Sequence, residues 1–268
     1  GTFTYGTSTL VMAKSGTQTI CMPHNTDIRH LTVNDGSTTQ ILTLGTTNGL
    51  IDIQGNLVVN EKVKSHADTN QSRLRMRGGD NTITIGSDVK TTALAEIYEL
   101  MFDISGGSGN INAPELTTQM IKITNGSVTA TGDLTLTREL EVNSGTTFNA
   151  NGNTIGYKAL DINGTLDLRN STAQSIDANS DYIDFTDGTL LSGNSTLQGF
   201  ATGANRTEFK APASQNLELV GTAKFLDVFA DSDLTVVGAV IDCDASAAGA
   251  NIRQFFHTLD TQQLLDAD

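Results

Sequence analysis

The stretch from Tyr157 to Asn170, YKALDINGTLDLRN, contains the pattern that indicates the fold of this chain. If its backbone is extended, one side carries the apolar residues Leu160, Ile162, Leu166 and Leu168. The opposite side carries the polar residues Asp161, Thr165 and Asp167. Asn163 and Gly164, which separate the two apolar pairs, are typical of a tight turn. The stretch therefore predicts two short strands joined at a corner.

Similar strand-and-corner units recur on both sides of this stretch. Leu140 before it and Ile183 after it each belong to an alternating apolar segment that is followed by a turn signal, like Leu160. The spacings, about 20 to 25 residues, fit one turn of a three-faced coil whose parallel strands stack about 4.8 Å apart. With 26 Gly, only 3 Pro and abundant Thr and Asn, the composition favours short strands and many corners. We therefore expect an all-β solenoid.

A longer repeat is present in the first half of the chain. Three pairs of segments match in their alternation: Thr9–Met12 with Thr82–Ile85, Ile28–Val33 with Ile97–Phe102, and Gly55–Asn60 with Gly132–Thr137. The offset between matched segments drifts by several positions from pair to pair. Such drift favours a solenoid, because its strands must stack whereas its corners can vary in length. We predict a solenoid over residues 1–250, with internal repeats near 1–80 and 81–156 and shorter rungs over 157–245.

Two segments depart from the strand pattern. Lys90–Phe102 has an apolar face at helical spacing, but its match to the strand at Ile28 favours a strand from about Ile97. Residues 251–268 also have an apolar stripe at helical spacing. The stripe residues are Ile252, Phe255, Phe256, Leu259, Leu264 and Leu265. They predict a short C-terminal helical cap over the apolar end of the solenoid, with a docking segment for a partner as the alternative.

The charge balance argues against several kinds of partner. The formal net charge is -14, which disfavours direct binding to nucleic acid and adsorption to an anionic membrane surface. No apolar run of about 18 residues predicts insertion into a membrane. The chain begins without Met or a signal-peptide pattern, so we expect it to be part of a longer or processed protein. Cys21 and Cys243 lie far apart in the sequence, and we expect two free, buried thiols.

Clustered carboxylates are the groups most suggestive of catalysis. The clusters are Asp161/Asp167, Asp181/Asp184/Asp187, Asp231/Asp233 and Asp242/Asp244. Glycoside hydrolysis uses two carboxylates roughly 5 to 10 Å apart, and successive rungs of a coil bring outward side chains that close. An acidic solenoid also places Asp on outer faces and in corners, and we favour that explanation. We therefore expect no catalytic residue and no enzyme activity.

Metal and cofactor sites are not predicted either. Asp177–Asp181 and Asp231–Asp233 offer oxygen ligands but lack the spacing of known calcium loops, although a structural calcium ion stays an alternative there. His24 and His30 have no second ligand pair nearby, so a zinc site is not expected. The chain also lacks a nucleophile elbow, a phosphate-binding loop and a dinucleotide fingerprint. We expect no cofactor.

A basic stripe is the one candidate interaction surface outside the C-terminal segment. Arg73, Arg75 and Arg77 alternate with Leu74 and Met76, which places the three guanidinium groups on one side of a strand. Such a stripe could bind acidic groups of a neighbouring subunit or an anionic glycan. A solvated face of an acidic protein is the simpler alternative.

Several segments resemble a known class of repeats. They are Gly1–Met12 (GTFTYGTSTLVM), Gly16–Ile20 (GTQTI), Ile28–Asn34 (IRHLTVN) and Leu160–Leu168 (LDINGTLDL). These segments resemble repeats in β-solenoid proteins of bacteriophage virions, above all tail-fibre and appendage proteins, and are similar to repeats in secreted bacterial adhesins. The resemblance covers about residues 1–245. It implies a right-handed parallel β-helix and a role in building or decorating a particle, and it implies no catalytic residue.

We accordingly expect a non-catalytic structural component of a bacteriophage virion, a tail, fibre or surface appendage acting in particle assembly or host attachment. The expected partners are copies of the chain itself, other virion proteins and a glycan or receptor on the host surface. The expected location is the virion, outside the cell. A secreted bacterial surface adhesin is the first alternative, and a glycan-degrading β-helix enzyme is the second.

Overall fold

The computed structural model of the chain is an all-β solenoid, in which every strand pairing named below is parallel. The described residues are 7–13, 16–20, 26–33, 40–44, 50–64, 72–89 and 91–175, together with the short strands beyond residue 180 whose bounds follow. No helix is present among them, and hence none that could span a membrane. The chain divides into two compact units, residues 1–137 and 138–268. The predicted fold class is confirmed for the described residues.

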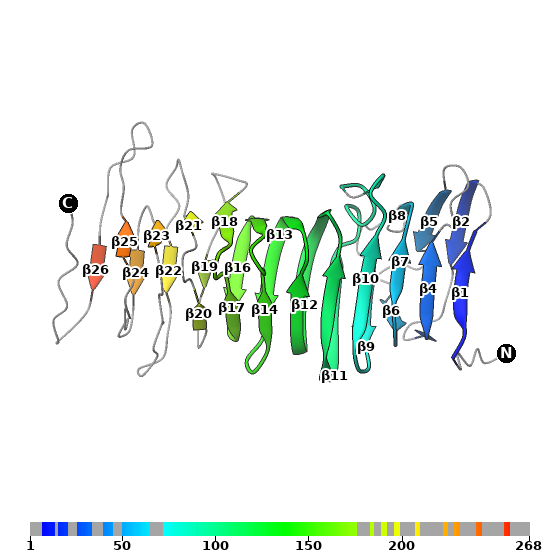
Figure 1. Cartoon of the computed structure of the whole chain (residues 1–268), viewed down its shortest axis with the longest axis horizontal. Helices are drawn as coiled ribbons and strands as arrows, with labels where there is room; N and C mark the ends of the chain where they lie inside the picture. The colour runs from blue at the N-terminus through cyan, green and yellow to red at the C-terminus, as the bar shows by residue number, and fades with distance from the viewer. Residues whose placement is uncertain are drawn as a thin grey trace. The chain divides into compact units, whose positions relative to one another are not determined.

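The first unit consists of short strands followed by the long strands β11 and β12 (Figure 1). Its described strands are β1 (Thr9–Met12), β2 (Gly16–Ile20), β3 (Thr26–Ile28), β4 (His30–Val33), β5 (Gln40–Leu44), β6 (Leu50–Ile53), β7 (Leu57–Val59), β8 (Lys62–Lys64), β9 (Arg73–Arg77), β10 (Asn81–Ile85), β11 (Glu99–Asn112) and β12 (Glu115–Ala130). β13 (Asp133–Val142) begins in the first unit and ends in the second.

Parallel pairing arranges the strands of the first unit on three faces. The β1 face contains β1, β4, β7, β10 and the C-terminal part of β11. The β3 face contains β3, β6, β9 and the N-terminal part of β11, and the β2 face contains β2, β5 and β8. β11 can turn between two faces because Gly106 adopts a φ of 73°, a left-handed conformation that is unstrained only for glycine.

Apolar residues stack in register on successive coils of the β1 face. The column consists of Leu10, Leu31, Leu57, Ile83 and Ile111. From Leu31 onward each side chain is at most 1% exposed, because alternation directs it into the coil while both sequence neighbours point outward. Burying each such side chain contributes about 1.5 to 3 kcal/mol, so these columns are the main source of stability.

The register accounts for the long repeat and corrects one of its alignments. Leu10 and Ile83 occupy the same column three coils apart, as the match between their segments predicted. The residue equivalent to Ile28, however, is Phe102 and not Ile97, so the sequence alignment of this pair was wrong. Alternation alone cannot distinguish a strand residue from an apolar residue in the preceding corner, and Ile97 lies in such a corner.

The third alignment is corrected in the same way. Leu57 stacks over Ile83, Ile111 and then Ala130, and Leu134 is not part of this column. The small Ala130 side chain made this column hard to recognise in the sequence. With these corrections the three offsets become nearly equal, so the drift seen in the sequence came from misaligned strands rather than from corner lengths.

The segment 90–102 forms a strand at its C-terminal end, as predicted. β11 begins at Glu99, slightly later than the expected start at Ile97. The preceding residues make tight turns, in which Thr92 N donates to Val89 O and Ile97 N donates to Leu94 O. Leu94 and Ile97, which suggested a helix, are fully buried in this corner.

The second unit begins within β13 and continues through shorter strands. The described strands are β14 (Thr147–Asn149), β15 (Thr154–Tyr157), β16 (Ala159–Ile162), β17 (Thr165–Asp167), β18 (Thr172–Ser175), β19 (Ile183–Asp184), β20 (Thr189–Leu191), β21 (Thr196–Gln198), β22 (Thr207–Phe209), β23 (Thr222–Lys224), β24 (Val228–Ala230), β25 (Val240–Asp242) and β26 (Phe255–His257). Leu140 pairs with Leu160, and Leu160 pairs with Ile183. The register predicted for these three residues is therefore confirmed.

The stretch 157–170 forms the two predicted strands, β16 and β17, with the corner at Asn163 and Gly164. Its four apolar side chains are buried, as expected. Asp167 is also buried, which corrects the expectation that it points outward with Asp161. Arg169 makes this burial tolerable, because its guanidinium group bonds to the Asp167 carboxylate.

The described part of the predicted C-terminal cap is not helical. Phe255–His257 form β26, which pairs in parallel with β24 so that Phe256 lies opposite Phe229. Adjacent aromatic residues favour a strand, and a short apolar segment fits helical spacing by coincidence. The remaining residues of the predicted cap lie outside the described residues. These are Ile252, Leu259, Leu264 and Leu265.

Candidate functional site

The basic stripe lies on β9, in the middle of the β3 face of the first unit. Leu74 and Met76 are fully buried, and this anchors the strand so that Arg73, Arg75 and Arg77 point outward. The side chains of Arg73 and Arg77 are 38% and 40% exposed, whereas that of Arg75 is 20% exposed. The alternation predicted from the sequence is confirmed, but the surroundings of the three guanidinium groups differ from a solvated stripe.

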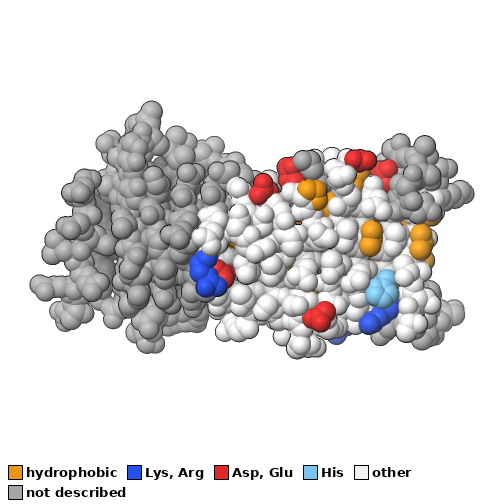
Figure 2. All heavy atoms as spheres, in the orientation of Figure 1, with side chains coloured by type: hydrophobic (Ala, Val, Ile, Leu, Met, Phe, Trp, Pro, Cys, Tyr) orange, Lys and Arg blue, Asp and Glu red, His pale blue; other side chains and the backbone are white. Residues whose placement is uncertain are grey.

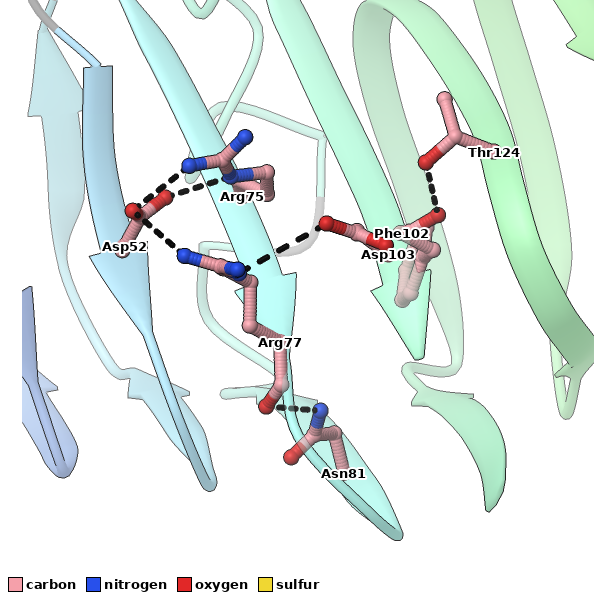
Figure 3. Close-up of polar contacts among 7 residues, drawn as sticks. All are labelled: Asp52, Arg75, Arg77, Asn81, Phe102, Asp103 and Thr124. Atoms are coloured by element: carbon pink, nitrogen blue, oxygen red, sulfur yellow. Dashed lines mark hydrogen bonds and ion pairs between the residues drawn. The ribbon is translucent and has the colours of Figure 1, made fainter. Parts of the chain in front are cut away.

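Arg75 is bound to a buried carboxylate one coil earlier. Its Nε and Nη2 atoms donate to the two carboxylate oxygens of Asp52 at 2.6 and 2.7 Å (Figure 3). The two residues are direct partners in the β6–β9 register, and the Asp52 side chain is only 1% exposed. The hydrogen bond with Asp52 raises the pKa of Arg75 against the opposing effect of burial, and the charges of Asp52, Asp103 and Asp27 add to that increase.

Arg77 extends the contact to the next coil. Its Nη1 atom lies 3.4 Å from Asp52 Oδ2, and its Nε atom lies 3.6 Å from Asp103 Oδ2 on β11. Asn81 donates from Nδ2 to the Arg77 carbonyl oxygen at 2.8 Å, which fixes the end of β9 (Figure 3). We call Asp52, Arg75, Arg77 and Asp103 the charge network. It links three successive coils through alternating positive and negative groups.

Arg73 is held more loosely than the other two arginines. Its Nε atom lies 3.6 Å from Glu99 Oε2, and its guanidinium carbon lies 6.0 Å from the centre of the Tyr98 ring. Glu99 is buried, and its Oε1 atom makes no hydrogen bond within the described part of the chain. The part of the stripe that stays accessible to another molecule is therefore the exposed sides of Arg73 and Arg77. Binding of a subunit or glycan there stays a prediction.

The two described carboxylates of the first predicted cluster each accept hydrogen bonds from a residue two positions further along the chain. Asp161 accepts a hydrogen bond from Asn163 Nδ2 at 2.9 Å. Asp167 accepts bonds from Arg169 Nε and Nη2 at 2.9 and 2.6 Å and from the Arg169 backbone N at 3.1 Å. Burial by itself would raise the pKa of Asp167, but the bonds from Arg169 outweigh burial and lower it. Asp167 therefore stays ionised and paired.

The register does bring other acidic residues into one column of the second unit. Asp161 pairs with Glu141 on β13 and with Asp184 on β19. Of the other clusters, Asp242 ends β25, whereas the remaining members lie outside the described residues. Those members are Asp181, Asp187, Asp231, Asp233 and Asp244.

Metal-ligand groups do not converge within the described residues. No group of three or more His, Cys, Asp or Glu side chains could hold a metal ion there. His30 instead accepts a hydrogen bond at Nδ1 from the backbone N of Asn56 at 3.0 Å. Cys21, Cys243 and the possible calcium ligands of 177–181 and 231–233 lie outside the described residues.

No family model, curated protein or solved structure matches this chain. The site must therefore be interpreted from its own geometry. Sequence reasoning missed Asp52, Glu99 and Asp103, the partners of the basic stripe. One signal could have identified two of them, because Asp52 precedes Arg75 and Asp103 follows Arg77 by about one coil length in the sequence.

Proposed function

We propose that this chain is a non-catalytic structural component of a bacteriophage particle, a tail, fibre or surface appendage that acts in assembly or host attachment. The observation that carries the proposal is that charged side chains of the described residues pair with one another. Several of the groups that suggested binding or catalysis are paired with other coils or with neighbouring residues, as in the charge network and the Asp167–Arg169 pair. The resemblance of the strand repeats to phage β-solenoid proteins supports the same role.

Immunogold electron microscopy tests the proposal directly. Antibodies against the purified chain are applied to purified phage particles whose genome encodes it and, separately, to the host cells. We expect gold particles on the tail or on surface appendages of the virion. Unlabelled virions would contradict the proposal, and label confined to the bacterial surface would favour the adhesin alternative.

The glycan-degrading alternative is supported by one observation, the pairing of Asp161 with Asp184 on adjacent strands. Adjacent parallel strands lie about 4.8 Å apart, close to the separation of about 5 Å between the carboxylates of retaining glycosidases. A polysaccharide screen with the wild-type chain, Asp161→Ala and Asp184→Ala tests whether the chain degrades glycans. We expect no release of sugar by any of the three. Release by the wild type that either substitution abolishes would show that the chain is an enzyme.

A further inference from the structure

The outward positions of the β1 face carry no Asp, Glu, Lys or Arg in the first five coils of the first unit. The first outward column consists of Thr9, His30, Asn56, Thr82 and Asn110, which are exposed or half-buried. In Figure 2 the surface over these strands is mostly white, and the red and blue side chains lie toward its margins.

The second outward column lies two positions further along each strand. It consists of Val11, Thr32, Val58, Thr84 and Asn112. Val11 is 49% exposed, and among the described residues it is the large apolar residue that is classed as exposed. On an ordinary protein surface about three of ten such positions would be charged. The two columns together form what we call the neutral face.

The neutral face contrasts with the other two faces of the same unit. The β3 face carries the charge network, and the β2 face carries Lys62 and Lys64. The full chain has 16 basic and 30 acidic residues. Charge is therefore abundant in the protein and absent from the two columns of the neutral face.

Hydrogen bonds between coils order the side chains of His30 and Asn56 on the neutral face. Asn56 N donates to His30 Nδ1 at 3.0 Å, and Thr82 N donates to Asn56 Oδ1 at 3.0 Å. Side chains that are already ordered lose little conformational entropy when another surface packs against them.

We propose that the neutral face is the surface through which two copies of this chain contact each other side to side. Copies with a net charge of -14 repel each other, and this repulsion is smallest where neither surface carries charge. The neutral faces of the two copies also have the same spacing, since the strands of each repeat at about 4.8 Å from coil to coil. Thr methyl groups, Val side chains and Asn amides can therefore meet in register along the whole face. The inference deepens the proposed function, because a particle component stands beside other copies of itself.

The size of the face predicts that the contact is weak. Five strands about 4.8 Å apart, each contributing about four residues, cover on the order of 300 Å². A typical stable interface buries about 800 Å² on each partner. We therefore expect association at high concentration, or between copies held close together in an assembly, rather than a tight dimer in dilute solution.

Substitution of Thr84 by Arg separates the proposal from general charge effects. Thr84→Arg makes the net charge less negative, so reduced overall repulsion alone would strengthen association. Contact through the neutral face predicts the opposite, because it places two like charges against each other. Thr19→Arg, on the exposed side of β2, is the matched control with the same change in residue and charge.

Sedimentation velocity of the full chain up to about 0.5 mM measures the effect, with circular dichroism as a check that both variants fold. We expect concentration-dependent association of the wild type, at least about a tenfold weaker association for Thr84→Arg, and no weakening for Thr19→Arg. In a second measurement, Thr84→Cys should form a disulfide between the two Cys side chains at position 84, identified by mass spectrometry, whereas Thr19→Cys should not form the corresponding bond.

Two outcomes would overturn the inference. One is a wild type that stays monomeric over this range and forms no position-84 cross-link as Thr84→Cys. The other is equal weakening by Thr84→Arg and Thr19→Arg. Neither outcome bears on whether virions carry the chain, which immunogold labelling decides, so the inference and the proposed function can fail separately.

Discussion

At the scale of single residues, Asp52 is the clearest case of a buried charge that is tolerated because residues of a neighbouring coil pair with it. Its buried carboxylate is satisfied by Arg75 and approached by Arg77. Asp52→Asn keeps the shape but removes the charge, so we expect the free energy of unfolding to fall by about 2 kcal/mol. Urea denaturation measures this loss. The control is Asp103→Asn, whose ion pair at 3.6 Å is partly exposed and should contribute less than about 1 kcal/mol. Equal losses would contradict the assigned importance of the buried pair.

The Asp167–Arg169 pair predicts a pH dependence of stability. The pKa of Asp167 is lower in the folded chain than its ordinary value of 3.8, so the folded state favours the ionised form. The resulting stabilisation is complete well above pH 4 and is lost as the pH falls through the folded pKa. A double-mutant cycle of Asp167→Asn and Arg169→Gln, measured by urea denaturation, should therefore show coupling at pH 7 that decreases as the pH is lowered below 4. Coupling that increases as the pH falls would contradict this assignment.

At the scale of elements, the corner between β16 and β17 shows why its glycine is needed. A Cβ atom at Gly164 would overlap the carbonyl oxygens of Asn143 and Thr146 on the preceding coil. Gly145, by contrast, has open space and a φ of 75°. We expect Gly164→Ala to reduce stability by about 3 kcal/mol and Gly145→Ala by about 1 kcal/mol, because overlap with backbone costs more than a strained φ. Thermal unfolding of the two variants measures the difference, and the reverse order would refute this explanation of the corner.

The elements also show how far the sequence allowed the structure to be predicted. Alternation and turn residues identified both strands of 157–170 and the register of Leu140 with Leu160, since apolar burial determines both. The alignment of Ile28 failed because strands and corners of one coil have similar apolar patterns. The burial of Asp167 could not be predicted from polarity, because it depends on the bonds from Arg169 within the same coil. The pairing of Asp52 with Arg75 could be inferred only from their separation of about one coil length in the sequence.

At the scale of the whole molecule, stacked coils should be removable one at a time. Residues 54–76 amount to one coil, since Ile53 and Met76 occupy equivalent positions. Deleting them should bring Ile83 over Leu31 and Phe102 over Ile53 while preserving every buried column. We expect a folded chain of lower stability, measured by circular dichroism and thermal unfolding, because each coil contributes mainly through its neighbours.

The control for that prediction is a shorter deletion within the same coil. Removing residues 54–64 takes away β7 and β8 but leaves β9, so two faces of the coil would have no strand while the third keeps one. The buried columns of those faces would then be interrupted. We expect this variant to misfold or aggregate, and a shorter deletion as stable as the full-coil deletion would show that the coil is not the unit of stability.

The parallel register also determines how the first unit responds to mechanical load. The hydrogen bonds between strands run in the direction in which coils stack, so a pull along that direction acts on one coil boundary at a time. Release of one coil, roughly 20 to 30 residues, adds about 7 to 10 nm of extended chain. Under tension the unit would therefore lengthen in discrete steps of this size, and each step would dissipate mechanical work.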